Sequence, residues 1–481
     1  MKFMKMQLGD FQECLPPFRE TSPTPFAKGG RGDFLWGQGE LKTKTVEEGG
    51  KYPLTSLLQR GGLVGLFLEY ALGFLALSLW LAGVSAEELL VDHLDPLPYD
   101  EKMSLKQVVD ATFENYPQGS VIAALKDESQ ALTQRSDSLI AGYPMIYLQY
   151  IDDRLLSNQG IVQIQTGYQI PIWMWGQRSA SRAVAEEAEK GANLFAFALK
   201  HEVAGLVRES LWNLVLMENR RGLAQQVYDV SKQLLATVRR RVELGDLARS
   251  DELMAESDLL DKQSQLTLAE AEVMHARKAY MNLTRLDKAP KQFVEIRSGT
   301  AEIHEQHPAI AAANALVERA QAEVEFTRLS KQGNQPSIMV GTQHERFEKG
   351  SSFNNETNLV LQIPIGGESW NAPFVAQANV ALNHKIADRA TLMRRLEKAL
   401  HEAEHILEVD RATLEIANKR KEIAETHLRM SRLAFEAGEI QLIDYLKIQA
   451  NSQAAIRDAM ERAILVKRDT AFYNQVVGVV P

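Results

Sequence analysis

Two short stretches of sequence decide the fold, because each recurs at a fixed distance along the chain. Glu243-Leu244-Gly245-Asp246-Leu247 is followed 193 residues later by Glu436-Ala437-Gly438-Glu439-Ile440. Gln169-Ile170-Pro171-Ile172 recurs with the same shift as Gln362-Ile363-Pro364-Ile365. Separated matches at one constant offset predict that two copies of a single structural unit make up most of the chain.

Each copy contains a long stretch that is free of proline and rich in helix-forming residues. No proline occurs between Pro171 and Pro290, or between Pro373 and Pro481. Apolar residues in these stretches recur at steps of three and four, which predicts helices with a narrow coiled-coil seam. The seam positions are Ala188, Ala192, Phe195, Leu199, Val203 and Leu206 in the first copy, and Leu392, Leu396, Ala399, Ala403 and Ile406 in the second.

A glycine interrupts each helical stretch and predicts a helical hairpin. Gly245 and Gly438 suit the left-handed backbone that follows a helix C-terminus. We expect the hairpins at 176–286 and 369–478, turning at these glycines. Their longest helices would span about 100 Å at 1.5 Å per residue, which is too long for a compact globule.

The N-terminal region has the pattern of an export signal. The apolar run from Leu63 to Val84 ends in Val84-Ser85-Ala86, which has the small residues that a signal peptidase requires. We therefore expect a signal peptide at 60–86, with a single transmembrane anchor as the alternative. Residues 1–59 are expected to be disordered or to belong to an over-extended gene start.

The segments before the two helical hairpins change to a period of two and predict strands. Apolar residues alternate with Gln and Gly or Asn, and each such segment follows a weaker candidate strand, so we expect β-hairpins at 145–170 and 337–365. This alternation fits a half-buried soluble sheet or lipid-facing barrel strands around a wet interior. The export signal and the overlong helices favour the barrel. Four strands cannot close a barrel, and open edges are not tolerated in hydrocarbon, so several chains must contribute.

The chain is thus expected to be mainly α-helical with a small β part. A first repeat at 87–286 and a second repeat at 304–481, joined by a linker at 287–303, would each contain a helix, a β-hairpin and a helical hairpin. The net charge of −9 argues against a nucleic-acid-binding surface. The single cysteine excludes a disulfide framework, no Gly-rich phosphate loop occurs, and no cofactor is expected.

A metalloprotease is the rival enzymatic interpretation. His401-Glu402-Ala403-Glu404-His405 matches the helical zinc motif H-E-x-x-H. At 100° per residue, His401 and His405 point away from the apolar seam, where a dry catalytic cavity is not expected. We expect a solvated charged face, with surface zinc binding at the two histidines as a weaker alternative. A periplasmic coiled-coil adaptor is a second alternative, although an adaptor has one helical hairpin flanked by soluble β-domains.

The chain resembles the TolC family of outer-membrane efflux channels. The resemblance covers about residues 104–480 and rests on the duplicated strand–strand–helix–turn–helix unit, on Ile-Pro-Ile-Trp and Ile-Pro-Ile-Gly at the strand ends, and on the two glycine-centred turns. It implies a homotrimer in which four strands per chain form one twelve-stranded barrel in outer-membrane lipid, while the helices form a long α-barrel through the periplasm. It also implies a passive duct of a tripartite efflux or type I secretion system, docked to an inner-membrane pump through a periplasmic adaptor (membrane fusion protein).

The resemblance also implies roles for residues at the two turns. The turns would be the periplasmic tips that contact the adaptor. Their residues are Leu244, Gly245, Leu247, Ala437, Gly438 and Ile440. The next helix would line the entrance, where well-known members carry two aspartates three residues apart; this chain has Asp444 followed by Lys447. Lys447 would offset the attraction of Asp444 for cations. Alternatively, Asp444 only stabilises the helix start. We hypothesise that the cargo consists of metal ions or small toxic organic molecules.

Overall fold

The computed structural model describes residues 97–331 and 334–481. The signal peptide expected at 60–86 and the segment 1–59 lie outside the described residues and stay predictions. The helices and strands, in chain order, are β1 (Tyr99–Asp100), α3 (Leu105–Glu114), α4 (Gly119–Asp137), β2 (Met145–Asp152), β3 (Val162–Pro171), α5 (Gln177–Glu243), α6 (Arg249–Thr284), β4 (Ala289–Pro290), α7 (Pro308–Ser330), β5 (Ser337–Arg346), β6 (Asn354–Gln362), α8 (Glu368–Glu436) and α9 (Leu442–Val476).

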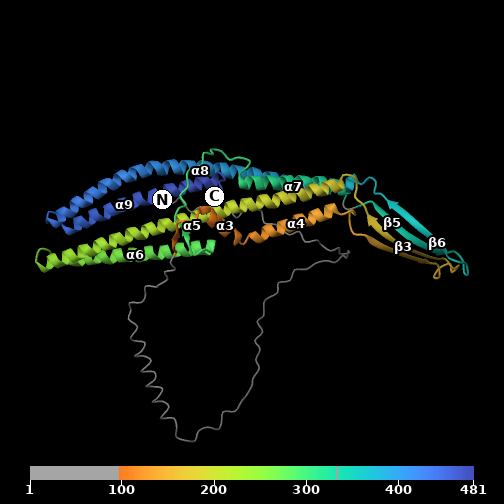
Figure 1. The fold of residues 1–481 in the computed structure, drawn as a ribbon, viewed down its shortest axis with the longest axis horizontal. Helices are drawn as coiled ribbons and strands as arrows, with labels where there is room; N and C mark the ends of the chain where they lie inside the picture. The colour runs from red at the N-terminus through yellow and green to blue at the C-terminus, as the bar shows by residue number, and fades with distance from the viewer. Residues whose placement is uncertain (1–96, 332–333) are drawn as a thin grey trace, which may run out of the picture. The chain divides into compact units, whose positions relative to one another are not determined.

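The order of these elements confirms the duplicated strand–strand–helix–helix unit. The series β2, β3, α5, α6 is repeated as β5, β6, α8, α9. The first long helices, α5 and α8, have 67 and 69 residues, so each is about 100 Å long. Both hairpins turn at the end of this unit that lies opposite the sheet (Figure 1). Among the described residues, no helix combines the length and the apolar character needed to cross a membrane.

The two tip glycines fix where α5 and α8 end. Gly245 and Gly438 have φ of 85° and 79°, in the left-handed region that a side chain disfavours. At each tip the backbone closes a Schellman motif, in which two N–H groups beyond the helix satisfy carbonyls of its last turn. The hydrogen bonds are Gly245 to Val242 (3.0 Å), Asp246 to Arg241 (2.9 Å), Gly438 to Phe435 (3.1 Å) and Glu439 to Ala434 (2.9 Å).

One antiparallel sheet contains all four long strands, in the order β2-β3-β5-β6. The two repeats meet where β3 pairs with β5, and Gly167 lies opposite Gly341 at that junction. A Cβ atom on Gly341 would lie 2.2 Å from the carbonyl oxygen of Thr166. The junction therefore requires a glycine at this position.

Apolar side chains are buried in three clusters along the helices. The first joins α3, α5 and α6, the second joins α7, α8 and α9, and the third lies at the two tips. Fully buried members of the first two include Val108, Val203, Leu211, Tyr280, Ile310 and Tyr473. Because the clusters follow one another along the helices, the hydrophobic effect is distributed over their length.

Three details differ from the sequence-based expectations. The helix before the first β-hairpin is divided into α3 and α4 near Pro117. The linker contributes β4, which pairs in parallel with β1. In the second seam, Ile406 is 42% exposed and Leu407 is 1% exposed. Steps of three and four allow either residue to follow Ala403, and the helix buries Leu407.

Candidate functional site

The four-stranded sheet has one polar face, built from alternate residues of each strand. Gln165 Nε2 of β3 donates a hydrogen bond to Gln343 Oε1 of β5 at 2.7 Å. Two residues away along each strand, and on the same face, Gln163 Nε2 donates to Glu345 Oε2 at 3.1 Å. The strand register places Gly167 and Gly341 on this same face, together with further residues that carry side-chain amides. The face can therefore bind water along its length.

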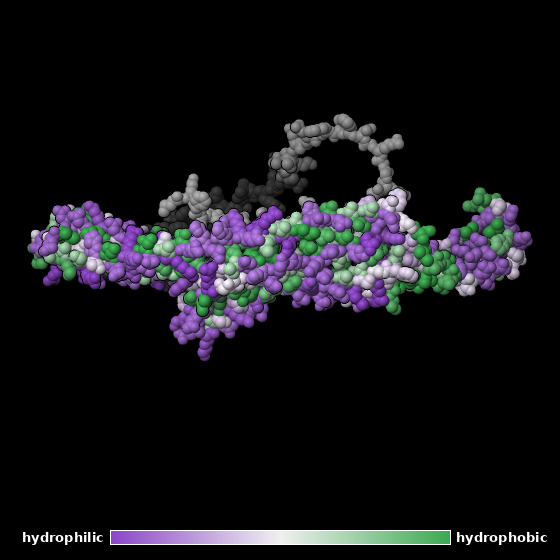
Figure 2. Space-filling model, turned by 90° about the horizontal axis from the view of Figure 1, so that it is seen from above, coloured by the Kyte–Doolittle hydropathy of each residue, from purple (hydrophilic) through white to green (hydrophobic). Residues whose placement is uncertain are grey.

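The opposite face of the sheet is apolar and exposed. Its residues include Ile146, Leu148, Tyr150, Tyr168, Val340, Leu359 and Leu361, each at least 49% exposed. Hydrophobic residues also gather where the strands leave the helices, whereas hydrophilic residues cover much of the helical surface (Figure 2). An apolar sheet face of this kind marks a surface that contacts lipid or another protein.

The sheet also has two open edges. Within the described residues, β2 pairs only with β3, and β6 pairs only with β5. The outer backbone groups of β2 and β6 are thus available for further strand pairing, and a long apolar edge does not stay unpaired in a stable protein.

The tips of the two helical hairpins are joined to each other. Phe435 and Tyr445 stack with ring centroids 5.2 Å apart. Arg241, from the first hairpin, lies over the Phe435 ring at 5.4 Å and donates from Nη1 to the Phe435 carbonyl at 2.9 Å. Since Arg241 and Phe435 belong to different repeats, these contacts fix one tip relative to the other.

The structure brings all six predicted tip residues to this one end of the helices. Four of them, Leu244, Gly245, Ala437 and Gly438, are exposed. The other two, Leu247 and Ile440, are half-buried and pack against the tip cluster. The four turn residues are therefore available to a partner. Leu247 and Ile440 instead stabilise the turns by packing against the tip cluster.

The two predicted entrance residues lie in the first turns of α9 and contact each other. Lys447 Nζ is 3.6 Å from Asp444 Oδ1, and both side chains are more than half exposed. Such an exposed pair contributes at most about 1 kcal/mol to stability. The Asp444 carboxylate also lies in the first turn, where it interacts favourably with the helix dipole. The ammonium group thus reduces the negative potential of Asp444 within the same chain.

The H-E-x-x-H residues do not converge on a cavity. His401, Glu402 and His405 are exposed, and Glu402 pairs with Lys398 at 3.5 Å. Between residues 97 and 481, with 332–333 excepted, no three His, Cys, Asp or Glu side chains form a group that could hold a metal ion. Within this part of the chain, the geometry offers His401 and His405 no third protein ligand.

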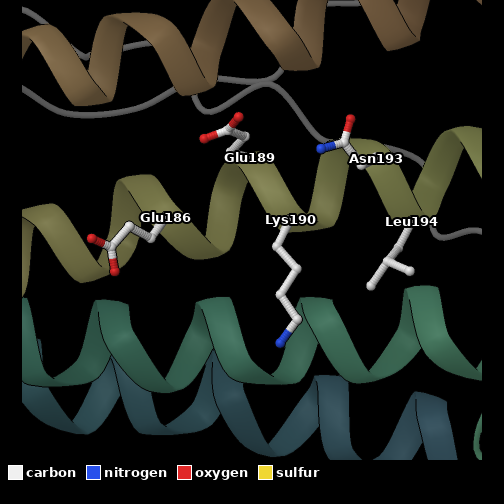
Figure 3. Close-up of a pocket in the computed structure, with 5 residues that line it drawn as sticks. All are labelled: Glu186, Glu189, Lys190, Asn193 and Leu194. Atoms are coloured by element: carbon white, nitrogen blue, oxygen red, sulfur yellow. The ribbon is translucent and has the colours of Figure 1, made fainter.

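A shallow hollow of about 480 Å³ lies on the surface of α5 and is lined by five residues (Figure 3). In this view Lys190 points toward α7, where it pairs with Glu318, and Glu189 points the other way. The remaining lining residues are Glu186, Asn193 and Leu194. The hollow is open to solvent, so it lacks the enclosure of a small-molecule site.

Sequence reasoning missed a buried polar network that connects the two repeats. Arg208 of α5 is 4% exposed and binds Glu295 of the linker through two nitrogens, at 2.8 and 3.0 Å. It also donates to Gln475 of α9. His201 Nε2 lies 2.8 Å from the Gln475 carbonyl, and the His307 ring packs edge-on against His201 at 5.1 Å.

Burial lowers the pKa of His201 to about 3 and that of His307 to about 4, and it is the largest cause in both cases. Both rings are therefore neutral at neutral pH. The spacing of His201 and Arg208, seven residues apart beside the apolar seam, is the signal that could have located this network.

The comparisons with known proteins agree with this architecture. No protein-family profile matches the sequence. The chain is 27% identical over 305 residues to the cobalt-zinc-cadmium resistance protein CzcC of Cupriavidus metallidurans, an alignment that covers 60% of this chain and 71% of CzcC.

Three solved outer-membrane proteins, two of them outer-membrane channels, have the same fold. CmeC of Campylobacter jejuni gives a TM-score of 0.61 at 16% identity, over 78% of this chain and 85% of CmeC. VceC of Vibrio cholerae gives 0.62 at 11% identity, over 78% and 97%. MtrE of Neisseria gonorrhoeae gives 0.59 at 16% identity, over 78% and 88%. With its duplicated hairpins and its four-stranded sheet, the chain has the fold of these outer-membrane proteins, and its sequence is similar to that of CzcC.

Proposed function

We propose that this protein is the outer-membrane exit duct of a tripartite efflux or type I secretion system, assembled from three copies of the chain. The single observation that carries the proposal is the sheet with a polar face, an apolar face and two open edges. The four strands alternate in direction, so β6 of one copy can pair antiparallel with β2 of the next. A ring closed in this way has no edges, its apolar side faces lipid, and its polar side encloses water.

The junction inside the chain predicts the register between copies. In the duplicated unit, β3 corresponds to β6 with a shift of 193 residues, and β5 corresponds to β2 with a shift of 192. The pairing of Gly167 with Gly341 then translates into a pairing of Val360 with Gln149 of the neighbouring copy. Both residues lie on the polar face, as the closed ring requires.

Exposed apolar stripes on the helices support the same assembly. Along α8, four apolar residues recur every seven positions and are 44 to 71% exposed: Val409, Ile416, Ile423 and Met430. Along α6, Leu253 and Leu260 are seven positions apart and 60% exposed. A heptad stripe is the contact surface of a coiled coil. We propose that helices of neighbouring copies cover these stripes and form the periplasmic α-barrel.

Cysteine cross-linking tests the assembly directly. A protein with Cys14→Ser, Gln149→Cys and Val360→Cys should form covalent trimers on oxidation, because opposed Cα atoms of paired strands lie within disulfide reach. The matched control, Gln149→Cys with Leu361→Cys, places the thiols on opposite faces of the sheet and should stay monomeric under denaturing electrophoresis. Absence of cross-linking in both proteins would contradict the proposed register.

Conductance tests the duct itself. Purified trimers in planar bilayers should form large, stable, water-filled channels. A detergent-solubilised monomer with no conductance would contradict the proposal. Since the described residues include no phosphate-binding loop, we propose that the duct is passive and that an inner-membrane pump supplies the energy through a periplasmic adaptor. Leu244→Asp combined with Ala437→Asp should then abolish adaptor binding at the tips while conductance is retained.

We propose divalent metal ions as the cargo, with small toxic organic molecules as the runner-up. The resistance function in the name of CzcC supports this choice. Deletion of the gene should lower the tolerance of the cell to cobalt, zinc or cadmium. At the entrance, Lys447→Gln should shift the reversal potential toward cation selectivity, because Asp444 would lose its ammonium partner. Asp444→Asn should shift it the other way.

We also propose that the protein is not an enzyme. The proteins that it resembles are the resistance protein CzcC and outer-membrane channels such as CmeC, and the exposed positions of His401 and His405 also support this proposal. Glu402→Gln would abolish hydrolysis by a metalloprotease of the H-E-x-x-H type. In the proposed duct the substitution should leave efflux and conductance unchanged.

A further inference from the structure

The apolar face of the sheet changes character along the strands. Near the helices, Ile338 of β5 lies opposite Ile170 of β3 and Leu361 of β6, so the face is apolar at this level. Side chains on one face of a strand recur every two residues. The same face therefore carries Arg346 at the end of β5 that lies farthest from the helices (Figure 1).

Arg346 is held at this end of the sheet by groups that carry no charge. Its Nε donates a hydrogen bond to the Gly160 carbonyl at 3.3 Å, and its guanidinium carbon lies 5.2 Å from the centre of the Phe353 ring. Lys349, from the following loop, packs closely on the same glycine, since a Cβ atom on Gly160 would lie 2.7 Å from Lys349 Cγ. Among residues 97–331 and 334–481, neither cation forms an ion pair with a carboxylate. Two positive charges are thus brought together around Gly160.

Two aspartates at the same end of the sheet are engaged by other donors. Asp152 pairs with Arg154 at 3.0 Å. Asp153 accepts hydrogen bonds from the backbone N–H groups of Gln159 at 2.6 Å and of Gly160 at 3.1 Å. Their carboxylates therefore serve to order the β2–β3 loop and do not neutralise Arg346 or its neighbour in the next loop.

Two glutamates complete the charges in this region. Glu345 is buried on the polar face of the sheet, where Gln163 and Gln343 donate hydrogen bonds to it. Glu348 is exposed in the loop and directly precedes Lys349. Its negative charge opposes the binding of an anion at the two cations, so its removal should strengthen such binding.

The level of Arg346 on the sheet corresponds to the boundary of a membrane. Ile338 and Arg346 are eight residues apart, which is about 26 Å along a strand and about 20 Å along the membrane normal for a strand tilted by about 40°. The apolar band of a membrane barrel is about 25 Å tall. Arg346 therefore lies near the limit of such a band, where its guanidinium reaches the lipid headgroups.

The opposite end of the sheet carries aromatic residues. Tyr143, just before β2, is 92% exposed, and Trp175, just after β3, is 96% exposed. Tyrosine and tryptophan are enriched at the boundary between lipid and water because their rings are amphipathic. The two ends of the sheet thus differ in chemistry, with aromatic rings on the helix side and cations on the loop side.

We propose that Arg346 and Lys349 bind a phosphate group of outer-leaflet lipid at the rim of the barrel, with one site in each chain. The guanidinium and ammonium groups donate charge-assisted hydrogen bonds to the phosphate oxygens, and the acyl chains of the same lipid lie along the apolar face. The inference rests on the proposed function, which turns this face toward lipid and places the strand loops at the outer surface.

Lipid displacement tests the site in full-length trimers purified in detergent, with a fluorescent diphosphorylated lipid A as the probe. Arg346→Gln combined with Lys349→Gln should weaken binding about 30-fold, because each cation near an anionic lipid contributes a factor of roughly five. The matched control, Lys398→Gln with Lys419→Gln, removes two exposed cations of α8 and should bind like the wild type. Equal binding by both double variants would overturn the proposal.

Two further measurements keep the test valid if the first double variant does not fold. Wild-type trimers should bind lipid A without phosphate groups at least tenfold more weakly, and Glu348→Gln should bind the diphosphorylated form about fivefold more tightly. Equal binding of the two lipids would overturn the proposal. Complete displacement of the lipid by inorganic phosphate would also overturn it, because free phosphate would then be the ligand.

Failure of this site can be told apart from failure of the proposed function. Trimers that cross-link through Gln149→Cys and Val360→Cys and conduct, yet do not distinguish the two lipids, would overturn the lipid site alone. Absence of trimers would contradict the proposed duct itself.

Discussion

The two helical hairpins have nearly the same length and the same glycine tip, yet they are packed differently. The α5 helix is covered by α4, α6 and α7 and contacts α9, and many of its residues are buried. The α8 helix packs mainly on α9 and α7, and far fewer of its residues are buried. One duplicated sequence thus supplies an inner helix that completes the fold of the chain and an outer helix that keeps an apolar stripe exposed.

The largest expected effect comes from a pair of equivalent positions. Leu223 of α5 is 8% exposed, whereas Ile416, its counterpart 193 residues later in α8, is 66% exposed. Ile416→Asp should leave the chain folded and abolish the trimer, because it places a charge in the contact between copies. Light scattering should show a helical monomer. The neighbouring change Lys419→Gln should keep the trimer. Trimers of Ile416→Asp would show that the stripe is not a contact surface.

The next largest effect is expected at the buried histidines, which join α5 to the second repeat. The pKa of His201 lies at about 3 and that of His307 at about 4, below the ordinary value of 6.5. The unfolded chain therefore binds more protons between pH 6.5 and pH 4, and stability falls as the pH falls. The loss should be on the order of 5 kcal/mol, visible as a lower urea midpoint. His201→Gln should remove about half of this pH dependence. A midpoint that does not change between pH 6.5 and pH 4 would contradict the assignment.

A smaller effect of opposite sign is expected in the α8–α9 seam. The raised pKa of Asp469 means that the folded chain binds the extra proton, so its contribution to stability is lost as the pH rises from about 4 to 6. Replacing the buried Asp469 with the residue at the equivalent position of the first repeat, Asp469→Ala, should raise stability at pH 7 by about 3 kcal/mol. Urea unfolding at pH 4.5 and pH 7 measures this change. An equal gain at both pH values would mean that repacking, and not the proton, is responsible.

The smallest effect is expected at the tips, where the two hairpins are alike. Gly245→Ala and Gly438→Ala should each cost about 1 kcal/mol, because both glycines have a left-handed backbone and closely similar Schellman motifs. Thermal unfolding of the two variants gives the comparison. A loss at only one tip would show that the contact of Arg241 with Phe435 supports the two turns unequally.

Much of this fold could be predicted because it is governed by local rules. The repeat offset, the absence of proline and the glycines at 245 and 438 determine the hairpins and their turns, and alternation determines the strands. The β1–β4 pairing depends on a tertiary contact that no periodicity records, whereas the division near Pro117 follows a local rule, because proline interrupts a helix. Sequence spacing also cannot decide between Ile406 and Leu407. Both satisfy the seam spacing, and only the packing of the helices determines which one is buried.

The functional residues were less predictable than the fold. The tip residues follow directly from the glycine turns, so their position at one end could be anticipated. The network of Arg208, Glu295 and Gln475 joins residues from three distant segments. Asp469 likewise occupies an ordinary helix position, and its burial becomes evident only in the folded protein.

The strand junction between β3 and β5 has a consequence for the origin of the protein. If that internal joint and the joint between copies follow the same register, the duplicated gene encodes two equivalent sixths of one ring. An ancestor of half the length could then have built the same circle from six identical pieces. Fusion of two pieces would have halved the number of encounters needed for closure. It would also have freed the second piece to carry a buried acidic residue, Asp469, where its twin has Ala276.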